Sequence, residues 1–119
     1  MNNKFLLAWM DDWQMSARLA KLSTSNSYKL IFCENGQQVP KDTAVPSVLI
    51  IDIGVLKEEE FKQITLLQED DTVFIIAYDL EMDGARIKYL RELGCDMVLK
   101  RNKLLKNLDT ILQKIINAD

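Results

Sequence analysis

The segment Ser47-Val-Leu-Ile-Ile-Asp52 joins four consecutive aliphatic residues to a single carboxylate. Three of the four aliphatic residues are β-branched, and so short an apolar run is typical of a strand that is buried on both faces. Open parallel sheets keep their binding sites at the carboxyl ends of such strands. The segment therefore predicts a parallel sheet with Asp52 at its functional edge.

Outward from this segment, strand-like and helix-like patterns alternate along the chain. Buried strands are expected at residues 5–9, 28–33, 48–52, 72–77 and 96–100. An amphipathic helix is expected to begin after Asp11 or Asp12, either of which can cap it, and to end at residues 23–27. Two more are expected over residues 58–68 and 82–93. The last helix is expected from its apolar stripe, which consists of Leu104, Leu105, Leu108, Ile111, Leu112, Ile115 and Ile116. Pro40 and Pro46 leave little room for a helix in residues 34–46, so we expect a loop with at most one helical turn there.

This alternation predicts an α/β fold. Short connections between strands and helices imply parallel strands with right-handed crossovers. Five strands fit the flavodoxin-like order 2-1-3-4-5, with helices on both faces and the second helix reduced or absent. We expect residues 1–119 to form one such domain, in which Asp11 and Asp12 converge with Asp52 at the sheet edge.

Composition narrows the possible classes of function. Hydrophobic residues make up 48% of the chain, and its net charge of -3 comes with scattered basic residues, so we expect no nucleic-acid partner. No apolar stretch reaches membrane-spanning length and no signal segment is present, so we expect no membrane partner. Cys33 and Cys95 show no metal-binding spacing and suit a reducing, cytoplasmic location as buried thiols. The chain has no histidine, the usual zinc ligand and general base.

Three motifs resemble the receiver domain of bacterial response regulators. They are Glu34-Asn-Gly36, Pro46-Ser-Val-Leu-Ile-Ile-Asp52 and Gly94-Cys-Asp-Met-Val-Leu-Lys-Arg101, and their order and spacing agree with the family over essentially the whole chain. The resemblance implies that Asp52 accepts a phosphoryl group and that Asp11 and Asp12 help it to hold Mg²⁺. It also implies a Thr or Ser hydroxyl after the fourth strand and a Lys-Pro pair after the fifth.

The chain departs from this family pattern at several positions. The hydroxyl position falls on Ile76 or Ala77, which cannot donate a hydrogen bond, and the lysine position falls on Lys100 or Arg101 with no proline after it. The acids follow the first strand one or two positions late, and Trp13 comes directly after them. Because phosphoryl transfer needs a divalent cation and a fixed positive side chain, these changes predict a degenerate receiver, or pseudo-receiver, without a cofactor.

The first functional hypothesis is a non-catalytic signalling module that is not phosphorylated and acts through protein–protein interaction. The resemblance implies a protein partner or a homodimer on the face made by the helix at 82–93, the strand at 96–100 and the last helix. That face offers Arg86, Lys88, Tyr89, Arg91, Met97 and Lys100, a composition common at interfaces.

The alternative hypothesis is a conventional receiver in a two-component phosphorelay. Asp52 would then be the phosphoacceptor, Asp11, Asp12 and Asp52 would hold Mg²⁺, and Lys100 or Arg101 would be the charge clamp. Simple capping also explains the acids, because an aspartate commonly caps a helix or a turn. A small-molecule domain of flavodoxin type is disfavoured because no glycine-rich turn follows the first strand.

Overall fold

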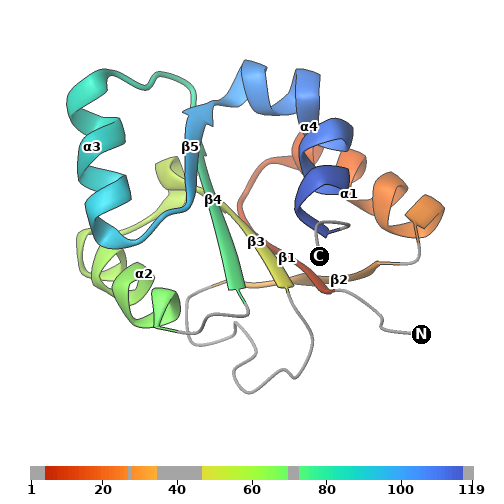
Figure 1. Ribbon diagram of the computed structural model, residues 1–119, viewed down its shortest axis with the longest axis horizontal. Helices are drawn as coiled ribbons and strands as arrows, with labels where there is room; N and C mark the ends of the chain where they lie inside the picture. Colours follow the sequence, from red (N-terminus) through yellow and green to blue (C-terminus); the bar gives the residue numbers. More distant parts are fainter. Residues whose placement is uncertain (1–4, 27, 35–46, 70–72, 117–119) are drawn as a thin grey trace.

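The computed structural model describes residues 5–26, 28–34, 47–69 and 73–116. Five parallel strands form one sheet in the order β2-β1-β3-β4-β5 (Figure 1). The strands are β1 (Phe5–Trp9), β2 (Lys29–Phe32), β3 (Ser47–Asp52), β4 (Val73–Asp79) and β5 (Met97–Lys100). The expected five-stranded parallel sheet and its order are confirmed.

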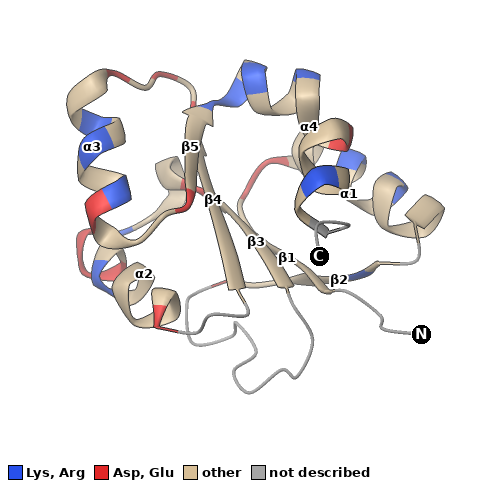
Figure 2. Ribbon diagram, in the orientation of Figure 1, with Lys and Arg blue, Asp and Glu red and all other residues tan. Residues whose placement is uncertain are grey.

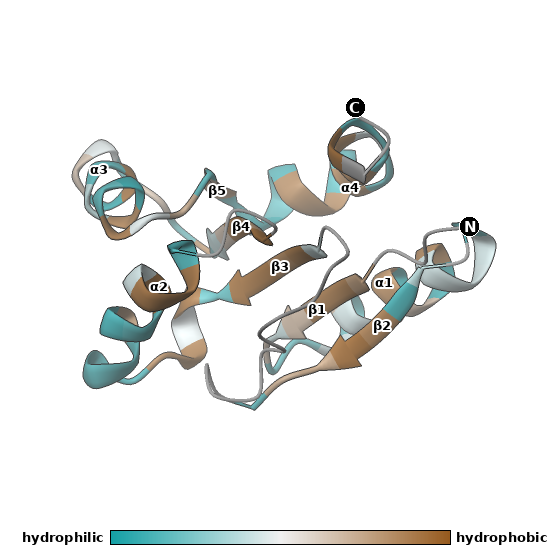
Figure 3. Cartoon of the chain, turned by 60° about the horizontal axis from the view of Figure 1, so that its bottom comes forward, coloured by the Kyte–Doolittle hydropathy of each residue, from teal (hydrophilic) through white to brown (hydrophobic). Residues whose placement is uncertain are grey.

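Helices cover both faces of this sheet. The helices are α1 (Trp13–Asn26), α2 (Phe61–Gln68), α3 (Gly84–Leu93) and α4 (Arg101–Ile116), with the 3-10 turns η2 (Ile53–Val55) and η3 (Glu58–Glu60) after β3. The helices α1 and α4 pack on one face, and α2 and α3 pack on the other (Figures 1 and 3). Within the described ranges, no helix is long and apolar enough to cross a membrane.

The polar run at residues 23–27 ends α1 as predicted, since the last residue of the helix is Asn26. Two helix starts differ from the sequence prediction, which placed them at residues 58 and 82. Asp83 caps α3, which therefore begins at Gly84. The acidic stretch 58–60 forms a 3-10 turn before α2 begins. Residues 35–46, where a loop with at most one helical turn was expected, lie outside the described residues.

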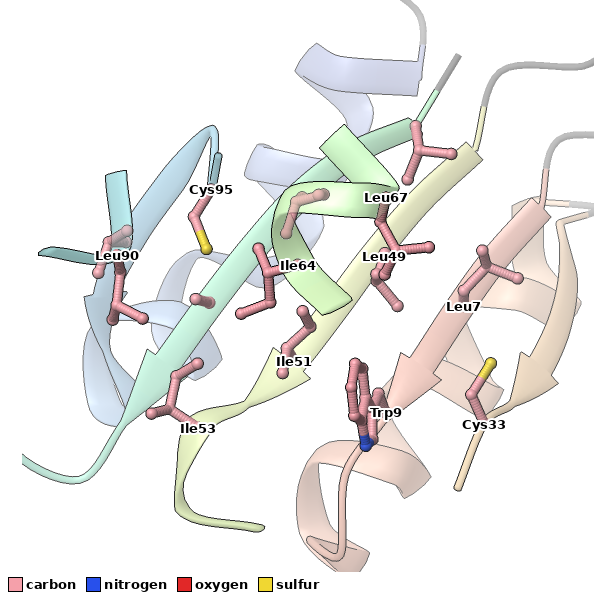
Figure 4. Close-up of a cluster of buried hydrophobic side chains, with 14 of the residues drawn as sticks. Leu7, Trp9, Cys33, Leu49, Ile51, Ile53, Ile64, Leu67, Leu90 and Cys95 are labelled. Atoms are coloured by element: carbon pink, nitrogen blue, oxygen red, sulfur yellow. The ribbon is translucent and has the colours of Figure 1, made fainter. Parts of the chain in front are cut away.

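Strand β3 is buried on both faces because its side chains alternate between two hydrophobic layers. Val48 and Ile50 pack in the layer under α1 and α4, whereas Leu49 and Ile51 pack in the layer under α2 and α3 (Figure 4). The free thiols Cys33 and Cys95 are buried in the second layer, as expected. Asp52 follows Ile50 by two residues, so its side chain belongs to the face that α1 and α4 cover.

The apolar stripe of the last helix is the main contribution of α4 to the core. Leu104, Leu108 and Leu112 are buried against β3 and β4, while the partly buried Leu105, Ile111 and Ile115 pack around them. The predicted stripe is thus confirmed over the residues whose side chains are described, with its centre at Leu108.

We expect Leu108→Ala to lower the free energy of unfolding by roughly 2–5 kcal/mol, the usual range for a leucine removed from a packed core. Ile111→Ala is the matched control from the same stripe, and its cost should be smaller because Ile111 is partly exposed. Urea denaturation of both variants measures the difference. Equal losses would contradict the packing described for α4.

Candidate functional site at the carboxyl edge of the sheet

The sheet order brings the ends of three strands together at one edge. β1 and β3 are neighbours with Trp9 level with Ile51, and β3 and β4 are neighbours with Asp52 level with Tyr78. Figure 2 shows acidic segments after β1 and β4 on the edge where α4 begins with basic residues. A pocket of about 330 Å³ opens there, lined by Asp11, Asp12, Trp13, Asp52, Gly54, Val55, Tyr78, Asp79, Leu80 and Arg101.

An ion pair between Asp12 and Arg101 closes one wall of this pocket. Arg101 donates from Nε to Asp12 Oδ2 at 2.8 Å and from Nη2 to Asp12 Oδ1 at 3.1 Å. The same Nη2 also donates to Gln14 Oε1 at 3.0 Å. Only 8% of the Asp12 side chain and 21% of the Arg101 side chain are exposed. A two-point contact with so little exposure fixes both side chains far better than a surface ion pair does.

Asp12 also accepts hydrogen bonds from two other elements. The backbone N–H of Met15 donates to Oδ1 at 3.1 Å, so Asp12 caps α1, and the hydroxyl of Tyr78 donates to Oδ2 at 3.0 Å. The hydrogen bond from Arg101 is the main reason that the pKa of Asp12 is lowered to about 2. The capping interpretation is therefore correct for Asp12, and both of its oxygens are already occupied by donors.

Asp52 has a different electrostatic environment. Its Oδ1 accepts the backbone N–H of Gly54 at 3.0 Å, which caps the turn η2, and its side chain is half-buried. Burial is the largest cause that raises its pKa, and the negative charges of Asp12 and Asp79 raise the pKa further. Ionised Asp52 is thus held at this edge against electrostatic repulsion.

The fourth strand requires a correction. It was expected to end at Ala77, but β4 continues to Asp79. Ile76 and Ala77, the residues assigned to the hydroxyl position of the family, are both buried within this strand. The residue level with Asp52 is Tyr78, which is fully buried and carries a hydroxyl. Burial is the main cause that raises the pKa of Tyr78, so the phenol stays protonated and donates to Asp12. The missed signal was Tyr78 itself, an aromatic residue that continues the apolar run.

The two basic candidates after the fifth strand point in different directions. Arg101 reaches into the pocket, whereas Lys100 lies outside it and approaches Glu81 at 3.7 Å with both side chains largely exposed. Arg101 is therefore the cation at the candidate site, although it binds Asp12 rather than Asp52. Asp11 is exposed at the pocket rim, next to Trp13.

The resemblance to receiver domains implies a Mg²⁺ site, and Asp12 does not fit the role of a free ligand at such a site. Mg²⁺ requires free oxygen ligands in near-octahedral geometry. Asp12 already accepts hydrogen bonds from Arg101, Met15 and Tyr78. In the part of the chain that the structure describes, no three His, Cys, Asp or Glu side chains are grouped closely enough to hold a metal ion.

The residues expected at an interaction surface lie on α3 and β5. Arg86, Tyr89, Arg91 and Lys100 are exposed, while Met97 is partly buried against the α4 layer. The ring of Tyr89 lies 6.1 Å from that of Phe61, centroid to centroid. Tyr89 therefore lies on the α2 side of α3, while Met97 lies on the other side of the sheet.

Comparison with solved structures finds this fold in response-regulator receiver domains. A response regulator from Thermotoga maritima has a TM-score of 0.75 over 99% of this chain and 100% of its own, at 13% identity. A response regulator of red-light signalling in R. palustris has a TM-score of 0.72 over 98% of this chain and 96% of its own, at 16% identity. A response regulator receiver protein from Pseudoalteromonas atlantica has a TM-score of 0.69 over 96% of this chain and 97% of its own, at 14% identity.

The similarity is therefore one of structure. No protein-family model matches the sequence, and no curated protein matches it. The chain has the flavodoxin-like fold of receiver domains, as its structural neighbours do.

The Asp12–Arg101 ion pair predicts a specific dependence of stability on pH. Because the folded-state pKa of Asp12 is about 2 against an ordinary 3.8, the pair stabilises the fold above about pH 4, and this contribution is lost as the pH falls toward 2. We expect the wild-type chain to lose more unfolding free energy over that range than Asp12→Asn or Arg101→Met. Chemical denaturation at each pH measures the free energy of unfolding of each variant.

Lys100→Met is the matched control, because it removes a neighbouring cation whose ion pair is exposed. Its pH profile should follow that of the wild type. An Arg101→Met profile that equals the wild-type profile would show that the ion pair does not contribute as described.

Proposed function

We propose that the chain is a non-catalytic signalling module with a receiver fold that is not phosphorylated and that acts in the cytoplasm through protein–protein interaction. The observation that supports this proposal is the saturation of Asp12. Its two oxygens hold the Arg101 guanidinium, the Tyr78 hydroxyl and a helix-capping N–H, so Asp12 is not free to share a divalent cation with Asp52.

The charge at Asp52 supports the same proposal. A transferred phosphoryl group would bring further negative charge to a carboxylate whose pKa is already raised by burial and by Asp12 and Asp79. Cations must neutralise that charge in the transition state. Arg101, the one cation among the described residues that line the pocket, is bound to Asp12 through both Nε and Nη2.

The alternative remains a conventional receiver with Asp52 as phosphoacceptor. The observation in its favour is the position of Asp52, which ends the central strand β3 and lines an open pocket. In that case Asp52 Oδ2 would take the phosphoryl group from a donor such as acetyl phosphate, and acetate would leave.

Intact-mass spectrometry after incubation with acetyl phosphate and Mg²⁺ separates the two functions. We expect no added phosphoryl group, because the oxygens of Asp12 are occupied by Arg101, Tyr78 and Met15 and are not free to hold Mg²⁺ beside Asp52. The matched control is Asp52→Asn, which keeps the side-chain shape and removes the acceptor. A mass increase in the wild type that is absent from Asp52→Asn would establish the conventional receiver instead.

We further propose that a protein partner or a second copy of the chain binds to the face formed by α3, β5 and α4. Arg86 and Arg91 are exposed on α3, and Lys100 is exposed at the end of β5. Arginine is a common anchor at protein interfaces because it combines apolar contact area with a charged end.

Sedimentation over a concentration series tests the homodimer on this face. We expect Arg91→Glu to weaken self-association by reversing a charge at the interface, and Leu66→Ser, at an exposed residue of α2, to leave it unchanged. A wild-type chain that stays monomeric would exclude the homodimer and leave a different partner protein. If Leu66→Ser weakened self-association and Arg91→Glu did not, the interface would lie on α2 instead.

A further inference from the structure

Two exposed apolar side chains flank the pocket at the carboxyl edge. Trp13 is 85% exposed and Leu80 is 70% exposed, and both contribute to the pocket lining. They come from separate elements, Trp13 from the start of α1 and Leu80 from the segment after β4. Exposed apolar groups that rim a polar pocket are typical of an interaction site.

The pocket between these two side chains carries more negative than positive charge. Its lining carries Asp11, Asp12, Asp52 and Asp79 against Arg101 alone. Arg101 is bound to Asp12. Asp79 Oδ1 accepts the backbone N–H of Leu80 at 2.8 Å, and Asp79 Oδ2 lies 3.5 Å from Arg86 Nη2. Among the described residues, no ion pair reaches Asp11 or Asp52.

Two of the carboxylates flank the same glycine. A Cβ atom placed on Gly54 would lie 3.2 Å from Asp52 Oδ1 and 3.6 Å from Asp79 Oδ1. A group that approaches Gly54 therefore meets both carboxylates at once. A planar cation with several donors suits this arrangement better than a small metal ion, which needs free oxygens on all sides.

We propose that this pocket is a docking site for an arginine side chain on a segment of a partner protein. The guanidinium lies between Asp52 and Asp79, and apolar neighbours of that arginine rest on Trp13 and Leu80. The complementary charge identifies the occupant, and the indole of Trp13 favours arginine further because a guanidinium stacks on aromatic rings. Arg101 on Asp12 shows that this edge already binds one guanidinium at two points.

This surface is distinct from the α3, β5 and α4 face and does not depend on whether Asp52 can accept a phosphoryl group. The test uses the whole chain without Mg²⁺ or acetyl phosphate, so its result is separable from that of the phosphorylation experiment. The probe is a short blocked peptide with one arginine between two leucines. Its matched control carries citrulline, which keeps the shape of arginine and removes the charge.

Nitrogen-15 NMR titration should show saturable shifts of the Trp13 indole N–H and of the amides at 52–54 and 79–80. We expect the citrulline peptide to bind about tenfold more weakly, as loss of a charged hydrogen-bonded contact predicts. Trp13→Ala and Asp52→Asn should each weaken the arginine peptide by roughly five- to tenfold. Leu66→Ser, exposed on α2 away from the pocket lining, should leave binding unchanged.

Several results would overturn the proposal. These are equal binding of the two peptides, absence of shifts at millimolar peptide, or displacement of the peptide by Mg²⁺ acting on the same amides. Concentration-dependent shifts of those amides in the chain alone would make a second copy the occupant and would also overturn it.

Discussion

The two-point contact between Arg101 and Asp12 determines how the carboxyl edge of this protein is built. It joins the first residue of α4 to the residue that caps α1, and Tyr78 adds a third attachment from the centre of the sheet. Two helices that leave the same edge are thereby held against one strand end. The contact holds the guanidinium against Asp12 rather than Asp52, and both partners of the contact form part of the pocket lining.

Much of the fold was predictable because it depends on local patterns. The alternation through Ser47–Asp52 defines a strand with two buried faces, and the stripe centred on Leu108 defines the helix that covers one of them. These patterns tolerate almost any aliphatic residue. That tolerance explains how a chain with 13% identity to a Thermotoga maritima response regulator has a similar fold.

The site was less predictable because its contacts join distant parts of the chain. The hydrogen bond from Tyr78 to Asp12 spans 66 positions, and that from Arg101 to Asp12 spans 89. The sequence indicated Asp12, Asp52 and Arg101 as candidates, but it could not show which of the two acids Arg101 would bind. The sequence prediction ended the fourth strand at Ala77, so it did not recognise Tyr78 as part of the site. The ends of strands and helices are the least reliable part of an assignment from sequence.

The position of Arg101 at the first turn of α4 has a mechanical consequence. Since the guanidinium is attached to Asp12, α4 cannot rotate or slide along the sheet without pulling the first turn of α1 or breaking two hydrogen bonds. Arg101 therefore links α4 to the start of α1 on this face of the sheet. A displacement of α4 along the sheet would move Asp12 and Gln14 with it, and the part of the pocket lining that Asp12 and Arg101 form would shift as well.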